Sequence, residues 1–143
     1  MNINDFSGAK LALLAKGHVL TLLRDNKPGI AHPNMWDLPG GGREGREEPL
    51  DCALRETFEE AHLRIAPQDI TWRRIYRNPR AGGLAHWFFV ATPGWLTLPP
   101  ARLGTEGQEL RWMQIDAFLS HDQAIPHLQD RLRDYLQHAA AAA

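Results

Sequence analysis

Residues 36–63 read WDLPGGGREGREEPLDCALRETFEEAHL. They place a glycine-rich turn directly before a helix, predicted from about Glu48 to Ala61, whose last turns are rich in glutamate. Side chains that can be buried recur along this helix at the spacing of one face, so we expect that face to pack on the core. Its members are Leu50, Leu54, Thr57, Phe58 and Ala61.

Glu56, Glu59 and Glu60 fall together on the opposite face of the predicted helix. Their position is unfavourable, because the helix dipole opposes anions in the last turns by ~0.3–1 kcal/mol each. Repulsion between carboxylates three and four residues apart adds to this cost. Such a cluster indicates either basic partners or a bound divalent cation, and oxygen ligands favour Mg²⁺ or Mn²⁺.

Other acidic and glycine residues in the stretch have ordinary structural explanations. Glu44, Glu47 and Glu48 are typical of a helix start, where the dipole favours anions. The glycine run lacks a following Gly-Lys-Ser/Thr, and no Gly-x-Gly-x-x-Gly follows a strand. A P-loop or a dinucleotide-binding site is therefore excluded.

The spacing from Gly41 to Leu63 closely resembles the Nudix box, G-x5-E-x7-R-E-U-x-E-E-x-G-U, in which U is a bulky aliphatic residue. Gly41 is followed after five residues by Glu47, and after seven more by RETFEEAHL, which begins at Arg55. Two positions depart from the pattern. Thr57 replaces an aliphatic residue, and His62 replaces a glycine, so His62 is expected to adopt a left-handed backbone conformation at some energetic cost.

This resemblance implies a fold, a chemistry and a set of roles. The fold is α/β, a Nudix-like α/β/α sandwich with a mixed β-sheet, and the chemistry is Mg²⁺-dependent attack on a diphosphate, with Mn²⁺ as a substitute. Either Glu56 or Glu59 is the general base, because related enzymes differ on this point. Arg55 is expected to pair with Glu47 and hold the glycine turn against the helix. The implied metal ligands are Glu56, Glu59, Glu60 and the carbonyl of Gly40.

The flanking sequence agrees with such a fold. Strands are predicted at residues 10–15 and 18–23, joined at Lys16-Gly17 and followed by a loop at residues 25–33. Further strands are predicted at residues 70–77, 84–92 and 109–115, with a turn region at residues 78–83. A short helix at residues 116–120 and a longer one at about residues 125–138 complete the pattern.

Composition predicts one ordinary globular domain, residues 1–143, with 43% hydrophobic and 23% charged residues. A formal net charge of −1 gives no broad basic surface for duplex nucleic acid, so a small-molecule nucleotide is the expected partner. We find no membrane-length apolar run and only Cys52, which excludes an intrachain disulfide and favours a cytoplasmic setting. A monomer and a homodimer are both compatible with the sequence.

Residues outside the box bear on the metal and the substrate. The segment EGQELRWM, from Glu106, is similar to a stretch of the bacterial Nudix pyrophosphatase that clears 8-oxo-dGTP. The resemblance makes Glu106 a further metal ligand, with Glu109 as the alternative. Ala124 stands near the place of that enzyme's purine-reading asparagine, and Pro79 lies near a proline typical of ADP-ribose-cleaving relatives. Candidate substrate contacts are Arg24, Trp36 and Arg77, with Arg43 and Arg80 as further phosphate-binding candidates.

The sequence therefore predicts a nucleotide pyrophosphatase that acts on acid anhydrides. Its substrate would be a nucleoside diphosphate derivative or a (d)NTP, including a damaged nucleotide such as 8-oxo-dGTP, and the alternative substrates are ADP-ribose and nucleotide sugars. A second class of function is a Nudix-fold module that binds or senses a nucleotide without cleaving it. The intact Arg55, Glu56, Glu59 and Glu60 favour the enzyme.

Overall fold

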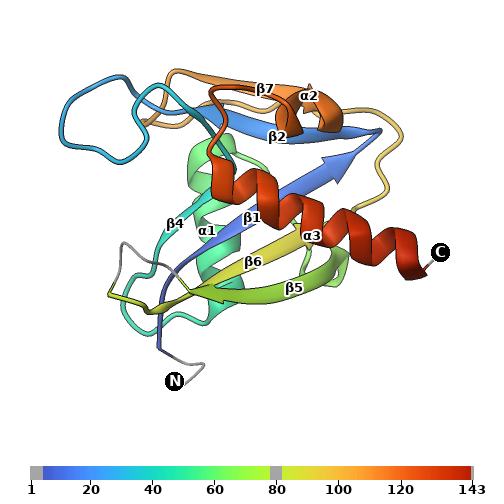
Figure 1. Ribbon diagram of the computed structural model, residues 1–143, viewed down its shortest axis with the longest axis horizontal. Helices are drawn as coiled ribbons and strands as arrows, with labels where there is room; N and C mark the ends of the chain where they lie inside the picture. The colour runs from blue at the N-terminus through green and yellow to red at the C-terminus, as the bar shows by residue number, and fades with distance from the viewer. Residues whose placement is uncertain (1–4, 78–81, 143) are drawn as a thin grey trace.

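The computed structural model describes residues 5–77 and 82–142, and a mixed β-sheet with helices on both faces forms its centre (Figure 1). The strand order is β3-β2-β1-β6-β5, with β4 paired to β1 and β7 paired to β2. Among the seven strands of the described residues, β1 and β6 form the one parallel pair, which links the two halves of the sheet. The strands are β1 (Phe6–Ala15), β2 (His18–Leu23), β3 (Trp36–Asp37), β4 (Gly40–Gly42), β5 (Ile70–Arg77), β6 (Ala85–Ala91) and β7 (Glu109–Gln114).

On the edge that does not pair with β6, the central strand β1 has two different neighbours along its length. Its last residues form a hairpin with β2, closed at Lys16 and Gly17, both of which have positive φ as a tight two-residue turn requires. Its first half, from Gly8 to Lys10, pairs instead with β4. Because β2 diverges from β1 beyond the hairpin, the glycine strand can lie beside the beginning of β1.

Two hydrophobic cores lie on the two faces of the sheet. Helix α1 (Pro49–Ala61) buries Cys52, Ala53 and Ala61 against apolar residues of β1 and β6. Helix α3 (Pro126–Ala142) covers the other face with Leu128 and Leu132, beside the short α2 (Ile115–Leu119). A single 3₁₀ turn, η1 (Pro67–Asp69), precedes β5. The predicted α/β/α arrangement with a mixed sheet is confirmed.

Most predicted elements are present, and the differences concern the ends of two elements and the segment around the glycines. Strand β1 begins at Phe6, four residues before the predicted start, and the alanine run extends α3 to Ala142. The glycine segment is not a turn: Gly40–Gly42 form β4, and the preceding β3 was not predicted. Residues 78–81 of the predicted turn region lie outside the described residues.

Helix α1 begins at Pro49 and ends at Ala61, and the next residue, His62, adopts the left-handed conformation expected of it, with φ 56° and ψ 33°. Its buried face is partly different from the prediction. Thr57 is fully buried and donates a hydrogen bond to the Ala53 carbonyl, so the hydroxyl at an aliphatic position is satisfied within the helix. Phe58 does not enter the core but lies against the side chains of His62 and Arg64.

Candidate active site

Arg55 is the hub of a charged network on α1. Its guanidinium donates to both carboxylate oxygens of Glu47, at 3.0 and 2.8 Å, as predicted. It also donates to Glu56 at 2.7 Å and to Glu59 at 3.0 Å, and to the Gly42 carbonyl at 2.9 Å. These contacts lower the pKa of Glu47 to about 2 and raise that of Arg55.

The Arg55 network corresponds to one of the two predicted explanations for the glutamate cluster. Basic partners or a bound divalent cation were expected to offset the repulsion, and the chain's own guanidinium contacts Glu56 and Glu59. Arg55 also approaches Glu44 at 3.5 Å. The forked, planar shape of the arginine head allows one side chain to contact several carboxylates and a backbone carbonyl at once.

Glu60 points away from Arg55 and toward the glycine strand. The Gly40 backbone N–H donates to its carboxylate at 2.7 Å. Burial raises the pKa of Glu60 to about 7, although Lys10 and the Gly40 N–H act in the opposite direction. The Gly40 carbonyl, predicted as a metal ligand, accepts a hydrogen bond from the Lys10 ammonium at 3.1 Å.

Close approach between β4 and α1 explains the glycines. A Cβ on Gly41 would lie 2.5 Å from a carboxylate oxygen of Glu56, and one on Gly40 would meet backbone atoms of β1. Gly40 also has φ 142°, a conformation that residues with side chains rarely adopt. Gly41 therefore lets the Glu56 carboxylate lie directly on β4, and Gly40 lets β4 lie close against β1.

A cavity of about 750 Å³ opens beside this network, and carboxylates dominate its lining. We call it the acidic cavity. Burial raises the pKa of Glu56 here as well, in opposition to Arg55. Its lining residues are Glu44, Glu56, Phe58, Glu59, Glu60, His62, Leu103, Gly104, Thr105 and Glu106.

The oxygen-rich lining fits Mg²⁺ or Mn²⁺ in its chemistry, because these ions prefer carboxylate and carbonyl ligands. Within the described ranges, however, no three His, Cys, Asp or Glu side chains are already gathered as an ion would hold them. Arg55 contacts Glu56 and Glu59, and Gly40 contacts Glu60. The predicted ligands therefore share a cavity but are paired with groups of the protein.

Glu106 and Glu109, the two candidates outside the box, lie in different surroundings. Glu106 is exposed and lines the acidic cavity together with Glu60. Glu109 begins β7 and pairs with Arg111 at 2.8 Å. The segment that carries Glu106 is fixed to the end of α1, because the Gly104 N–H donates to the Glu60 carbonyl at 3.1 Å. The geometry favours Glu106.

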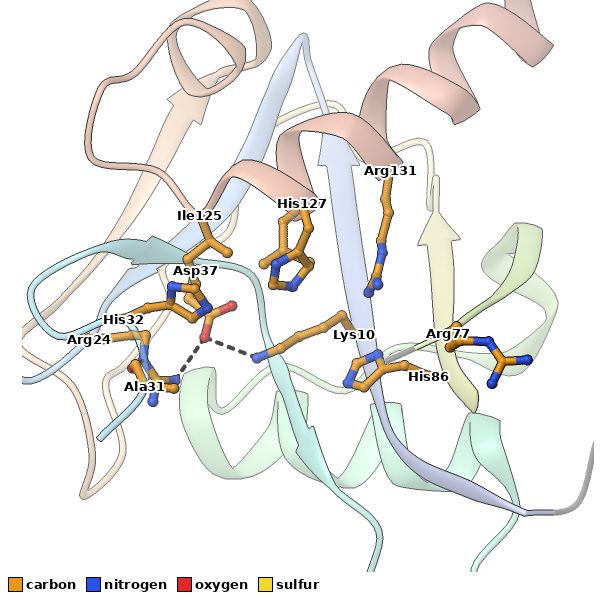
Figure 2. A pocket seen from close by; sticks show the side chains of 11 residues that line it. Lys10, Arg24, Ala31, His32, Asp37, Arg77, His86, Ile125, His127 and Arg131 are labelled. Atoms are coloured by element: carbon orange, nitrogen blue, oxygen red, sulfur yellow. Dashed lines mark hydrogen bonds and ion pairs between the residues drawn. The ribbon is translucent and has the colours of Figure 1, made fainter. Parts of the chain in front are cut away.

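A second cavity, of about 460 Å³, lies between β1, β6 and the first turns of α3 (Figure 2). We call it the cationic cavity, because four permanently positive side chains and three histidines surround a single carboxylate, that of Asp37. Its lining residues are Lys10, Arg24, Ala31, His32, Asp37, Arg77, His86, Ile125, His127, Leu128 and Arg131.

Asp37 is almost fully buried and is already paired. Lys10 and Arg24 each donate to the same carboxylate oxygen at 3.0 Å, and the Leu38 backbone N–H donates to the other oxygen at 2.7 Å. Lys10 also donates to the carbonyls of Leu38 and Gly40. This lysine therefore connects the floor of the cationic cavity to the glycine strand.

The cavity confirms some sequence candidates as neighbours and adds others. Arg24 and Arg77 line it. Trp36 is instead buried in the core against His121 and lines neither this cavity nor the acidic cavity. Arg43 instead lies over the Phe6 ring. Pro79 and Arg80 lie outside the described residues.

Six charged or histidine residues of the lining were not predicted as site residues: Lys10, His32, Asp37, His86, His127 and Arg131. Only Lys10 carried a signal, as the single charge inside an otherwise apolar strand. Burial lowers the pKa of His86 to about 3 and that of His127 to about 4, so both imidazoles are neutral at neutral pH.

A smaller cavity of about 180 Å³ shares lining residues with both sites, and we call it the connecting cavity. Glu60 and Glu106 belong to it and to the acidic cavity, and Arg24 belongs to it and to the cationic cavity. Lys27 adds a further cation. A ligand that spans the three cavities would thus place its middle near Arg24 and Glu60.

Comparison with known proteins now decides the family. The model of the NUDIX domain matches residues 8–135, which include both cavities and the whole glycine and α1 stretch. The chain belongs to the Nudix family. The family predicted from the box is therefore confirmed, whereas the 8-oxo-dGTP branch in particular is not shown.

The relatives of this Nudix chain are named as hydrolases, in line with the predicted class. It is 33% identical over 86 residues to a nucleoside triphosphate pyrophosphatase/Nudix hydrolase fusion protein of Bifidobacterium longum, covering 60% of this chain and 17% of that protein. It is 37% identical over 83 residues to a CMP-5'-(N-acetyl-N-hydroxy-3-aminopropyl)phosphonate hydrolase of Streptomyces rubellomurinus, covering 57% and 38%. The chain thus spans well under half the length of these relatives.

A solved structure with the same fold is a bifunctional NMN adenylyltransferase/ADP ribose pyrophosphatase of Francisella tularensis, complexed with AMP and manganese. The TM-score is 0.78 at 19% identity, with 94% of this chain and 42% of that chain covered. This likeness supports the fold. Among the described helices of our chain, none is both long and apolar enough to cross a bilayer.

Proposed function

We propose that this Nudix protein hydrolyses a diphosphate linkage in a nucleoside diphosphate derivative or a (d)NTP, with Mg²⁺ as cofactor and Mn²⁺ as a substitute. The observation that carries the proposal is the pair of connected cavities, one lined by carboxylates and one by cations. Phosphate-transfer sites need both: oxygen ligands for a metal ion and positive side chains for the phosphates. The ligand is a small molecule of nucleotide type.

Glu56, Glu59 and Glu60 are the residues that would hold the ion, with Glu106 and the Gly40 carbonyl as further donors. When bound, Mg²⁺ supplies charge neutralisation and activates water for attack on phosphorus. Arg55 keeps Glu56 and Glu59 oriented on α1. Gly40 holds the Glu60 carboxylate through its N–H.

Glu56 or Glu59 acts as the general base that takes the proton from the attacking water. Glu56 is half-buried with a raised pKa, whereas Glu59 is more exposed. A general base needs a raised pKa and access to water, which favours Glu56. On the other side of the glycine strand, Lys10 and Arg24 bind phosphate oxygens. Their buried partner Asp37 holds both cations in position.

The names of similar proteins and the residues of the site limit the class of substrate but do not identify a single compound. The similar proteins of Bifidobacterium longum and Streptomyces rubellomurinus are named for activity on nucleoside triphosphates and on a CMP derivative. An 8-oxo-dGTP substrate has support at the metal-binding residues only, because Ala124 is buried and carries no group to read a purine. ADP-ribose and nucleotide sugars therefore stay in the candidate set.

One observation favours the second class, a module that binds a nucleotide without cleaving it. The chain's own Arg55 already neutralises Glu56 and Glu59, and Glu60 is held by a backbone N–H. The side chains thus stand as a satisfied polar network. A binder would keep this network when a nucleotide enters the cationic cavity.

A nucleotide panel with product analysis separates the two classes. The panel comprises 8-oxo-dGTP, the four dNTPs, ADP-ribose, dinucleoside polyphosphates and nucleotide sugars, each incubated with Mg²⁺. We expect release of phosphate, pyrophosphate or a nucleoside monophosphate from at least one substrate, and loss of this activity in Glu60→Gln. Tight binding of a panel member without turnover, or equal activity of both proteins, would overturn the proposal.

A further inference from the structure

Arg131 is a buried guanidinium without an anion. Its residue is 7% exposed, and its closest described partner is the ring of Tyr76, 4.5 Å from the guanidinium carbon. Among residues 5–77 and 82–142 the structure gives it no hydrogen-bond acceptor and no ion pair. A charge that is largely removed from water is normally paired, because desolvation without a partner is unfavourable.

Carboxylates near this arginine are occupied by other groups. Asp134 accepts a hydrogen bond from the Tyr76 hydroxyl at 2.8 Å and lies 3.6 Å from Arg74. Asp37 is held by Lys10 and by a second cation on the far side of the cavity. Asp134 still acts on Arg131 at longer range and opposes the lowering of its pKa by burial, but among the described residues no carboxylate forms an ion pair with this arginine.

The Arg131 side chain points into the cationic cavity, and another group without a hydrogen-bond partner lies beside it. Figure 2 shows its side chain reaching down from α3 toward Lys10 and His86, with His127 beside it and Arg77 on the same side. The buried Nδ1 atom of His86 has no hydrogen-bond partner among the described residues. Arg131, Arg77 and Lys10 thus bring positive donors to one end of the cavity, and a ligand can supply the acceptor that Arg131 lacks.

This end is not the place of the diphosphate. The connecting cavity joins the metal-binding carboxylates to Arg24, and Figure 2 shows Arg24 on the opposite side of the cationic cavity from Arg131 and Arg77. A diphosphate near Glu60 would be contacted by Arg24 and Lys10. The side of the cavity that holds Arg131 and Arg77 can therefore take an anion that is separate from the diphosphate.

We propose that the substrate carries a second anionic group of the phosphate-ester class, remote from the cleaved diphosphate, and that Arg131 binds this group. The proposal rests on the proposed function for the position of the diphosphate. The lining favours an anion at this end over a neutral base, because its polar groups are mainly cations and imidazoles, with Asp37 already paired to two of the cations. The carrier of the phosphate is either a nucleoside or a free sugar.

Calorimetric binding in the presence of a metal chelator tests this directly. The nucleoside arm compares AMP with adenosine 3′,5′-bisphosphate, and the sugar arm compares ribose 5-phosphate with ribose 1,5-bisphosphate. We expect the bisphosphate to bind ~10-fold or more tightly than its monophosphate in one arm, the size of a charge-assisted hydrogen-bonded contact. The arm that shows the preference identifies the carrier.

Variants assign the preference to Arg131. Arg131→Met keeps the volume but removes the charge, and we expect it to bind the two ligands of the pair equally well. Arg131→Lys should restore part of the preference, which a purely structural loss would not do. Arg133→Met is the matched control, because Arg133 lies exposed on the same helix and outside the cavity, and it should keep the full preference.

The outcomes separate this proposal from the proposed function. No preference in either arm, or a preference that survives in Arg131→Met, overturns the anion site. Because the assay needs neither metal nor turnover, a protein that is inactive on every nucleotide but shows an Arg131-dependent preference would overturn hydrolysis alone. Thermal unfolding of Arg131→Met and Arg131→Lys checks folding, and binding by the lysine variant decides the question where the methionine variant is unfolded.

Discussion

The acidic and cationic cavities differ in how the chain builds them. Most carboxylates of the acidic cavity come from one continuous stretch, from Glu44 to Glu60, whose order is set by a strand and a helix. The cationic cavity takes its side chains from separate elements, including β1, β3, β6 and α3. A local sequence pattern can thus specify the first cavity, whereas the second exists only when the sheet is assembled.

The largest effect is expected at Glu60, the carboxylate shared by the acidic and connecting cavities. Glu60→Gln keeps the size of the side chain and its acceptor for the Gly40 N–H but removes the charge. We expect kcat/KM to fall by ~10²-fold or more, because even groups that only support a metal ligand cost 10–100-fold. Glu48→Gln, at an exposed glutamate before α1, is the matched control, and equal loss in both variants would contradict the role of Glu60.

The acidic cavity also shows which features of the site the sequence could predict. Helical spacing indicated α1 and the grouping of Glu56, Glu59 and Glu60, which line one cavity in the structure. The Arg55–Glu47 pair was implied by the resemblance to the Nudix box, because Glu47 precedes the helix, and the structure contains this pair as well. The strand conformation of Gly40–Gly42 was not predicted, because it depends on pairing with β1 from thirty residues earlier in the chain.

Arg55 should give the next largest effect. Arg55→Lys keeps the charge but loses the fork that contacts Glu47, Glu56 and Glu59 together. We expect kcat/KM to fall by ~10–100-fold with little change in the binding of a nucleotide in the cationic cavity. Steady-state kinetics and calorimetry measure the two quantities. Arg46→Lys serves as the exposed control, and an unchanged rate in Arg55→Lys would show that the network is dispensable.

The glycine strand provides a test of geometry alone. Gly41→Ala places a Cβ 2.5 Å from the Glu56 carboxylate, which must then move, and we expect ~10-fold or greater loss of kcat/KM at nearly unchanged stability. Gly42→Ala has no atom closer than 3.9 Å to the new Cβ and is the control. The two variants should unfold at similar denaturant concentrations. If Gly42→Ala lost as much activity, close approach to Glu56 would not be the reason.

A smaller effect separates Glu106 from Glu109. Glu106→Gln removes a carboxylate from the edge of the acidic cavity, and we expect the Mg²⁺ concentration needed for half-maximal activity to rise several-fold, at most ~10-fold. Glu109→Gln breaks only an exposed pair with Arg111, worth ~0–1 kcal/mol, and should leave this concentration unchanged. The reverse result would assign the role to Glu109.

The cationic cavity shows why the remaining residues escaped sequence analysis. Arg131 lies among the charged residues of α3 and resembles any solvated helical arginine until the structure shows it buried. His86 lies in a strand between apolar residues, where one imidazole has no distinguishing spacing. Their common feature is a shared end of one cavity, which depends on contacts between distant parts of the chain.

His86 gives the smallest effect, on stability rather than activity. Burial lowers its pKa to about 3 in the folded state, below its ordinary value of 6.5, so the unfolded chain binds more protons between these values. The free energy of unfolding should therefore fall as the pH drops below 6.5, by ~1 kcal/mol for each pH unit. Denaturant unfolding of the metal-free protein at about pH 7.5 and about pH 5.5 measures this.

His86→Gln should reduce this pH dependence, because glutamine cannot take up the proton. The difference between variant and wild type cancels contributions from other groups, such as Glu60, whose raised pKa acts in the opposite direction. An equal pH dependence in the two proteins would show that the imidazole is protonated without cost in the folded state.

The division of labour between the two cavities is tested most directly by titrating the protein with Mn²⁺ and measuring the bound ion by electron paramagnetic resonance. We predict that the wild type binds Mn²⁺, that Glu60→Gln binds it ~10-fold or more weakly, and that Arg131→Met binds it within about twofold of the wild type. A wild type that binds no Mn²⁺, or a Glu60→Gln variant with unchanged affinity, would contradict the account.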